Sequence, residues 1–216
     1  ITVEDPVEYK IYGINQVQVN AKAGLTFANG LRSILRQDPD IIMVGEIRDS
    51  ETAEIAIRAS ITGHLVLSTI HTNDTASTII RLIDMGIEPY LVSSSITGII
   101  SQRLVKVLCN SCKTSYLASE EEKRLMGIKE QKDVMLFKAN GCNKCIKGYR
   151  GRTAVHEVLF MDKTIRKLVN NKSSADEIKS VAVKNGMATL FENAVNLAIK
   201  GITSLEEVLK VGFTID

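Results

Sequence analysis

Short apolar runs that end in polar residues recur along the first half of the chain. Residues 41–44 are four consecutive apolar side chains between a Pro-Asp turn and a glycine, and residues 64–71 contain a second apolar run. Uninterrupted runs of this length predict strands that are buried on both faces of a parallel sheet. Residues 1–3 and 16–20 predict two further short strands.

The segments between and after these strands have the period of amphipathic helices. Thr26 is a suitable N-cap for a helix over residues 27–37, and Asp49 or Ser50 for a helix over 51–62. We expect further helices over residues 75–85, closed by Gly86, and from Pro89 to about Leu108. Strands that alternate with helices in this way predict a parallel sheet covered by helices.

The second half of the chain changes character. It begins with a polar stretch in which Ser119 and Glu122 form a capping box, and it continues into a strand over residues 153–160. Three short amphipathic helices follow, with residues 170–173 as a loop or hinge before them. The first helix begins at a Ser174/Glu177 capping box, and the second spans residues 189–200 and is ended by Gly201. The third begins at a Thr203/Glu206 capping box.

Composition sets broad limits on function. The 216 residues are 44% hydrophobic and 24% charged, with a net charge of +2, which implies no global attraction to nucleic acid or acidic lipid. No apolar run approaches the roughly 20 residues that cross a bilayer. The chain begins inside an expected strand and without methionine, so we expect it to be a fragment of a longer protein.

Four cysteines form two pairs, and each pair has a two-residue gap. These pairs are Cys109/Cys112 and Cys142/Cys145, a spacing that lets all four thiolates reach one tetrahedral zinc ion. Redox-active pairs or buried thiols are the alternatives, but two pairs with no other cysteine favour a structural zinc site. All four ligands are used, so no coordination position remains for catalysis.

A zinc ribbon can also bind nucleic acid. Its basic patch in this chain would consist of Lys144, Lys147, Arg150 and Arg152. The nearly neutral net charge and the lack of interleaved aromatic residues weigh against that function, so we expect no nucleic-acid partner.

Charged side chains follow the expected strands at their carboxyl ends, where parallel sheets bind ligands. Glu46 follows the expected strand over residues 41–44, and His71 ends the apolar run over 64–71. An acidic turn over residues 4–8 follows the expected strand over 1–3. A carboxylate at this edge could polarise water or hold a magnesium-bound phosphate. Solvated turns and a structural histidine are the alternatives.

Arg32 and Arg36 lie four residues apart, so we expect them to share one face of the helix over 27–37. Two arginines presented together suit phosphate recognition. A solvated basic face is the alternative.

Read together, these motifs closely resemble one family over essentially the whole chain. The motifs are Glu4-Asp-Pro-Val-Glu8, the segment 40–49, the block from Gly63 to Asp74, and the cysteine pairs. The chain resembles the carboxyl-terminal part of the type II secretion and type IV pilus assembly ATPases, in the extension and secretion branch that carries the tetracysteine insertion.

The resemblance implies an α/β fold in three parts. These are a partial RecA-like parallel sheet core over residues 1–105, a zinc-binding subdomain over 106–152, and a strand with a helical subdomain over 153–216. It also implies a hexameric motor on the cytoplasmic side of a bacterial inner membrane, attached there through a platform protein, that hydrolyses ATP with Mg²⁺ to assemble pilus or pseudopilus subunits.

The resemblance also implies roles for single residues. Glu46, in the segment matching Walker B, acts on the Mg²⁺ shell and the attacking water. Glu4, Asp5 and Glu8 belong to the acidic Asp box, with the two glutamates counted as catalytic. The histidines His64 and His71 sense the γ-phosphate, the basic residues Arg32 and Arg36 reach nucleotide near a subunit boundary, and the zinc ligands are Cys109, Cys112, Cys142 and Cys145.

One departure from the family is large. The phosphate-binding loop Gly-x-x-x-x-Gly-Lys-Ser/Thr is absent, and Gly-Lys occurs nowhere in the chain. Without the amides and lysine of that loop the phosphates lose their main anchor. We therefore expect half of an ATP site that is nearly inert alone. The alternative function is a zinc-stabilised protein-interaction module that docks on an inner-membrane platform protein.

Overall fold

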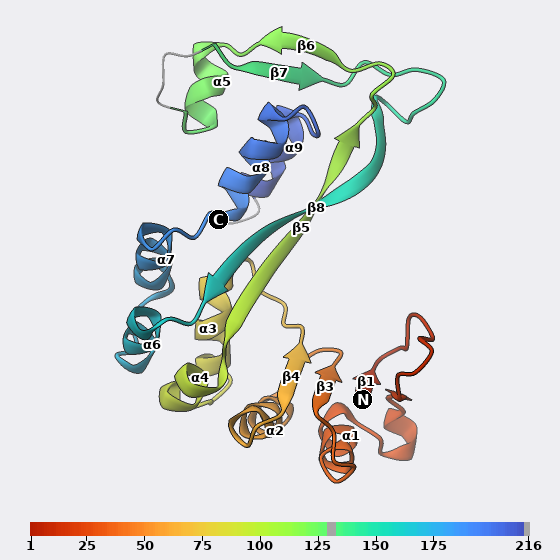
Figure 1. The fold of residues 1–216 in the computed structure, drawn as a ribbon, viewed down its shortest axis with the longest axis vertical. Helices are drawn as coiled ribbons and strands as arrows, with labels where there is room; N and C mark the ends of the chain where they lie inside the picture. Colours follow the sequence, from red (N-terminus) through yellow and green to blue (C-terminus); the bar gives the residue numbers. More distant parts are fainter. Residues whose placement is uncertain (129–132, 214–216) are drawn as a thin grey trace. The chain divides into compact units, whose positions relative to one another are not determined.

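The computed structural model describes residues 1–128 and 133–213, and Figure 1 labels their helices and strands. The chain folds into two compact units that do not follow chain order. The first consists of residues 1–72, 76–99 and 160–182, and the second of residues 73–75, 100–159 and 183–216. The division into three functional parts at residues 105 and 152 stays a prediction.

The first unit contains the parallel sheet that the sequence predicts. Its strands are β1 (Thr2–Glu4), β2 (Gln16–Gln18), β3 (Ile41–Val44) and β4 (Leu65–Ser68). They lie in the order β2-β1-β3-β4, and every neighbouring pair is parallel. The register pairs Val44 of β3 with Ser68 of β4, so the carboxyl ends of these two strands meet.

Helices α1 (Phe27–Ile34) and α2 (Ser50–Ile61) supply apolar side chains to the core of this sheet. Both N-caps are as expected, because the Thr26 side chain accepts from the N–H of Asn29 and the Asp49 side chain accepts from that of Thr52. The core cluster is made of Val3, Leu31, Ile34, Ile42, Val44 and Ala56.

The prediction that β3 is buried on both faces is wrong. Ile42 and Val44 are fully buried, whereas Ile41 is 52% exposed, and on the neighbouring strand Leu65 and Leu67 are 53% and 50% exposed. Alternate residues of a strand point to opposite faces of a sheet. In the structure one face of this sheet therefore packs on the core, and the other presents half-exposed apolar side chains.

The remaining helices of the first unit lie further along the chain. They are α3 (Thr75–Asp84), α4 (Pro89–Ser95), α6 (Lys163–Asn170) and most of α7 (Ala175–Lys184), whereas the first residue of α3 and the last two of α7 belong to the second unit. The sequence reading missed α6, whose N-cap Asp162 accepts from Ile165 N–H. Arg166 of α6 donates to the carbonyl oxygens of Ser93 and Ile96, which ties α6 to α4.

The prediction of a helix from Pro89 to Leu108 is correct for its first two turns and wrong for the rest. Helix α4 ends at Ser95, and residues 98–108 form the long strand β5 (Gly98–Leu108). The segment Ile96-Thr97-Gly98-Ile99-Ile100 combines β-branched residues with a glycine. Both residue types lower helix propensity, and β-branched side chains favour a strand.

The second unit combines two pairs of strands with the helices α5, α8 and α9. Strand β5 pairs with β8 (Tyr149–Phe160) in a two-stranded sheet, and β6 (Thr114–Leu117) pairs antiparallel with β7 (Met135–Lys138). Helix α5 (Glu120–Leu125) begins at the predicted Ser119/Glu122 capping box. Helices α8 (Leu190–Ile199) and α9 (Leu205–Phe213) share a core with β7, which includes Leu136, Leu190, Ala194, Val208 and Val211.

Of the two capping boxes predicted at residues 174 and 203, one forms and the other does not. The Ser174/Glu177 capping box is present, with reciprocal bonds of 3.3 Å. The Thr203/Glu206 box is wrong, because α9 begins at Leu205 and the hydroxyl of Thr203 donates to the carbonyl oxygen of Lys106 instead.

None of the helices in the described part of the chain is long and apolar enough to cross a membrane.

Candidate functional site

The carboxyl ends of β3 and β4 bring Glu46 and His71 together. The N–H of Ile47 donates to the carbonyl oxygen of Thr69 at 2.9 Å, and the hydroxyl of Thr69 donates to that of Gly45 at 2.6 Å. These bonds fix the two segments that leave the sheet. The Nε2 atom of His71 consequently lies 3.4 Å from the Oε2 atom of Glu46, as the strand order predicts.

Glu46 is held on one side and accessible on the other. Its side chain is 13% exposed and is also contacted by the Nε atom of Arg48, whereas the side chains of Arg48 and His71 are 70% and 82% exposed. The carboxylate of Glu46 is thus mostly shielded from solvent and lies beside two exposed basic side chains at the sheet edge. This arrangement suits a group that orients a water molecule or acts near a charged phosphate.

The acidic turn after β1 has one hydrogen-bonded carboxylate and two that are exposed to solvent. The Oε1 atom of Glu4 accepts from the Thr2 hydroxyl at 2.6 Å and from the Gln16 side-chain amide at 3.0 Å. These two hydrogen bonds lower the pKa of Glu4 below its ordinary value. Glu4 is therefore directed towards β2, while Asp5 and Glu8 are exposed to solvent.

The two histidines lie at opposite ends of β4. The Nδ1 atom of His64 lies 3.0 Å from the carbonyl oxygen of Ala59, just before the strand begins, whereas His71 follows the end of the strand. Four residues of strand span about 13 Å. The structure therefore brings His71, but not His64, to Glu46, and the sensing role of His64 stays a prediction.

The two arginines do not share a helix face. Helix α1 ends at Ile34, so Arg36 lies in the turn beyond it and is exposed. Arg32 lies on α1, and its Nη2 atom forms an ion pair of 2.7 Å with Glu51, both side chains being about half exposed or more. The prediction that both arginines project from one helix is wrong for Arg36.

The four cysteine sulfur atoms come together as the spacing predicts. Cys109 follows β5 and Cys112 precedes β6, while the second pair lies between β7 and β8. The Sγ atoms lie within 4.8 Å of one another. Three separations are 3.9 Å (Cys109 to Cys142), 3.7 Å (Cys112 to Cys145) and 3.6 Å (Cys142 to Cys145).

These separations fit a tetrahedral zinc ion. A tetrahedron with Zn–S bonds of about 2.3 Å has sulfur atoms about 3.8 Å apart. The backbone supports the arrangement, because the N–H of Cys109 donates to the carbonyl oxygen of Gly148 at 2.8 Å and joins the two cysteine loops. The four residues present therefore form a complete donor set for one structural metal ion.

The thiols of the first pair differ in acidity. A hydrogen bond from the backbone of Ser111 is the main reason why the pKa of Cys109 is lowered to about 7, and burial raises the pKa of Cys112 to about 11. Because metal ligation requires thiolates, binding at such a site releases protons.

Sequence reasoning missed two partners of the sheet-edge carboxylates. Gln16, which binds Glu4, was assigned only to a strand, and no motif marks it. Arg48, which binds Glu46, lies in the segment 40–49 but was given no role of its own. The i, i+2 spacing of Arg48 and Glu46 was a usable signal, because alternate residues of an extended segment lie on the same side.

Comparison with known proteins places these features in context. A family model described as "Type II/IV secretion system protein" matches residues 1–210. Type II secretion system protein E of Pseudomonas aeruginosa is 52% identical over 212 residues, which are 98% of this chain and 42% of that protein. The type IV pilus assembly ATPase PilB of Thermus thermophilus is 54% identical over 211 residues, 96% of this chain and 24% of that protein.

A solved structure has the same fold. The pilus retraction motor PilT with bound ADP superimposes with a TM-score of 0.70 at 30% sequence identity, covering 97% of this chain and 51% of that one. The chain thus spans less than half the length of the two sequence relatives named above.

Proposed function

Because this chain belongs to the type II/IV secretion system protein family, we propose that it carries the hydrolytic half of an ATP site in a motor that assembles pilus or secretion pseudopilus subunits. Similar proteins named as ATPases, and one solved with ADP, support ATP as the substrate. The chain has no phosphate-binding loop of the Gly-x-x-x-x-Gly-Lys-Ser/Thr type. The phosphates of ATP therefore need a loop from outside these 216 residues.

The observation that carries the proposal is the contact between Glu46 and His71 at the carboxyl edge of the sheet. In ATP hydrolysis a water oxygen attacks the γ-phosphorus and the bond to ADP breaks. We assign Glu46 to orienting that water through a hydrogen bond from the water to its carboxylate. Mg²⁺, when bound, supplies the positive charge that offsets the phosphate oxygens.

His71 would report the state of the γ-phosphate. Its exposed ring touches Glu46 without being packed in the core, so it can exchange that carboxylate for a phosphate oxygen at little cost in packing. Glu4 and Glu8 keep the catalytic role, and Asp5 and His64 the nucleotide-sensing role, that the family resemblance implies. These assignments belong to the proposal.

Arg32 and Arg36 would reach nucleotide near a subunit boundary. Arg32 is paired with Glu51, and such an exposed ion pair is worth only about 0–1 kcal/mol. Exchanging Glu51 for a phosphate therefore costs little. We propose that the intact protein is a hexamer on the cytoplasmic side of the inner membrane that acts through a platform protein, and that the four cysteines hold a structural zinc ion.

The test uses the intact protein, with its phosphate-binding loop. Glu46→Gln keeps the size of the side chain but removes its charge, and we expect ATP turnover to fall by about 10²–10³-fold while ATP binding persists. The matched control is Glu54→Gln, an exposed glutamate paired with Arg58 on α2. Equal turnover of the two variants would refute the assignment of Glu46.

A further inference from the structure

The turn between α8 and α9 presents two carbonyl oxygens to the rest of the second unit. The N–H of Ile202 donates to the carbonyl oxygen of Leu197 at 3.0 Å, and that of Gly201 donates to Ala198 at 2.9 Å. This is a Schellman motif, with Gly201 in the left-handed region at a φ of 68°. It gives hydrogen-bond donors to carbonyl groups in the last turn of α8, and the carbonyl groups of Gly201 and Ile202 remain available to accept bonds from other residues.

Both of these carbonyl groups are bound by residues that flank the first cysteine pair. The backbone N–H of Leu108, directly before residues 109–112, donates to the carbonyl oxygen of Ile202 at 2.8 Å. The Nζ atom of Lys113, directly after the same residues, donates to that of Gly201 at 2.7 Å. The two ends of the loop that carries Cys109 and Cys112 are thus attached to two consecutive residues of the turn.

The Lys113 side chain is held by a second contact besides its hydrogen bond to Gly201. Lys113 is half-buried, and its Nζ atom also lies 5.1 Å from the centre of the Phe137 ring, within the range of a cation–π interaction. That ring packs directly on Gly201, where an added Cβ would lie 2.7 Å from two ring carbons. The ammonium group therefore contacts both an aromatic ring and a carbonyl oxygen.

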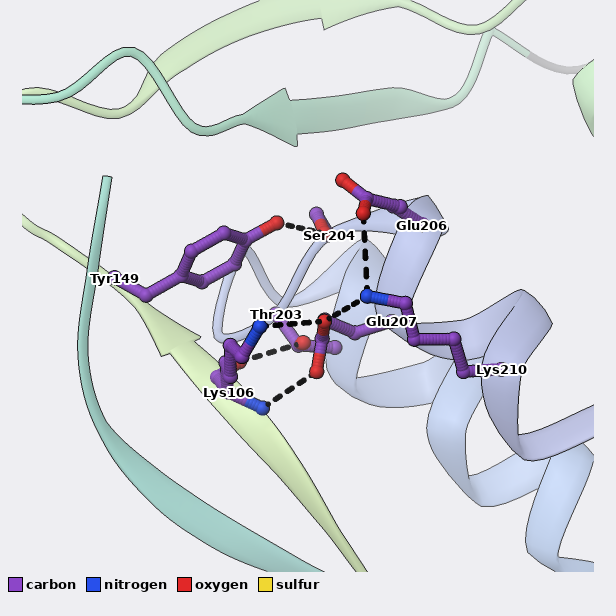
Figure 2. A network of polar contacts seen from close by, with 7 residues as sticks. All are labelled: Lys106, Tyr149, Thr203, Ser204, Glu206, Glu207 and Lys210. Atoms are coloured by element: carbon purple, nitrogen blue, oxygen red, sulfur yellow. Dashed lines mark hydrogen bonds and ion pairs between the residues drawn. The ribbon is translucent and has the colours of Figure 1, made fainter. Parts of the chain in front are cut away.

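Figure 2 shows that the rest of the turn and the start of α9 are attached to the strands on either side of the cysteines. The fully buried Thr203 donates to the carbonyl oxygen of Lys106 at 2.8 Å, and the N–H of Lys106 donates to the Glu207 carboxylate at 3.0 Å. The Tyr149 hydroxyl, which follows the second pair, lies 2.8 Å from that of Ser204. Residues next to both cysteine pairs therefore hold this turn.

We propose that Lys113 is a positioning residue for the tetracysteine metal site, and that the bound metal and residues 201–204 stabilise each other. The inference rests on the structural metal of the proposed function. Coupling between two sites is reciprocal, so loss of the metal must loosen the turn, and loosening the turn must weaken metal binding by the same factor. Loss of a residue that orients metal ligands typically costs 10–100-fold in metal affinity.

The first experiment measures zinc affinity of the 216-residue chain against a competing chromophoric chelator. Lys113→Met keeps the length of the side chain but removes every donor, and we expect it to bind zinc about tenfold more weakly. Lys113→Arg keeps donors and retains most of the affinity. The matched control is Lys138→Met, which removes the same charge from an exposed position on β7.

The second experiment measures amide hydrogen exchange of the unaltered chain with zinc and after its removal. The amides of Leu108 and Lys106 report directly on their bonds to Ile202 and Glu207, and we expect both to exchange faster without zinc. Exchange in α6, which belongs to the other compact unit, is unchanged. This arm needs no substitution, so it decides the question even where Lys113→Met fails to fold.

The results distinguish failure of the metal site from failure of the coupling alone. If the unaltered chain and Lys138→Met both bind no zinc, the metal site of the proposed function fails together with the coupling. If zinc binds but Lys113→Met and Lys138→Met have equal affinities, or if chelation leaves the Leu108 amide unchanged, only the coupling is overturned.

Discussion

The Nε2 atom of His71 lies 3.4 Å from the Oε2 atom of Glu46, across the carboxyl ends of two neighbouring parallel strands. Glu46 is mostly shielded from solvent and His71 is open to it, so the pair joins a sheltered carboxylate to an exposed imidazole ring. The same edge lacks any Gly-Lys sequence that could hold phosphates. Under the proposed function, a segment other than this sheet edge would therefore have to hold the phosphates.

The 216-residue chain should release phosphate from ATP no faster than its own Glu46→Gln variant. Without the phosphate loop, the β- and γ-phosphates lose their main anchor. A coupled assay of phosphate release with excess Mg²⁺ and ATP measures the two rates. A rate for the unaltered chain well above that of the variant would contradict the half-site interpretation.

The chain should purify with about one zinc ion, held by its four thiolates. Removing the ion should speed amide exchange over residues 106–150 and leave exchange in β1, β3 and β4 largely unchanged, because those strands belong to the other compact unit. Metal analysis by mass spectrometry gives the stoichiometry. An ordered chain that contains no metal would overturn the assignment.

Replacing Glu157 with Gln should destabilise the second unit by about 2–4 kcal/mol. The side chain is 1% exposed and accepts from the N–H and hydroxyl of Thr75, at 3.1 and 2.5 Å, and from the N–H of Leu190 at 3.2 Å. An amide cannot accept on both of its polar atoms, so one helix start loses its partner.

Urea denaturation, followed through amide exchange in α8, measures the free energy of unfolding that Glu157→Gln loses. Thr75→Val removes only the hydroxyl and should cost about 1 kcal/mol. If Glu157→Gln is no more destabilising than the exposed control Glu206→Gln, the carboxylate is not holding these helix starts.

The second unit should lose stability in acid partly through Glu207. Burial alone would raise the pKa of Glu207, but hydrogen bonds from the Lys210 side chain and the Lys106 backbone, with the charges of both lysines, outweigh burial and lower the pKa below its ordinary value. A lowered carboxyl pKa stabilises the fold fully above the unfolded value, and this stabilisation is lost as the pH falls through the folded value.

Melting temperatures between about pH 3 and pH 6 test the role of Glu207. Glu207→Gln should be less stable than the unaltered chain near pH 6 and should flatten the decline at lower pH. Its exposed neighbour Glu206, which also binds Lys210, provides the control Glu206→Gln. A full acid-dependent decline in Glu207→Gln would assign the effect to other groups.

Gly201→Ala should be more damaging than Gly186→Ala. Both glycines have a positive φ, 68° and 100°, and both lie just after the end of a helix. An alanine at 186 meets open space and costs about 1 kcal/mol in backbone strain. An alanine at 201 also collides with the Phe137 ring. Equal melting temperatures would mean that the ring moves aside freely.

The parallel sheet and its edge site were predictable because local pattern decides them. Apolar runs bounded by turn residues gave β3 and β4, and parallel strand order alone placed Glu46 near His71. The cysteine spacing predicted the four-sulfur cluster for a similar reason, since short loops constrain where each pair can reach.

Features that depend on distant partners were not predictable. Residues 98–108 are apolar enough for a helix, and their strand form depends on β8, which lies much later in the chain. Thr203 has the sequence of a capping residue but donates to Lys106, and Arg36 falls outside its helix because α1 ends early. In each case a contact or a helix end outside the local pattern decides the outcome.

The bond between Lys106 and Glu207 joins residues 101 positions apart, and this separation has a consequence for synthesis on the ribosome. All four cysteines leave the ribosome before the turn at 201–204 that flanks them in the folded chain. We therefore expect the metal to be captured by a loosely held loop, and the later-translated residues 201–204 to fix that loop in place. Premature termination before Gly201 would then yield a nascent chain that binds zinc but releases it quickly.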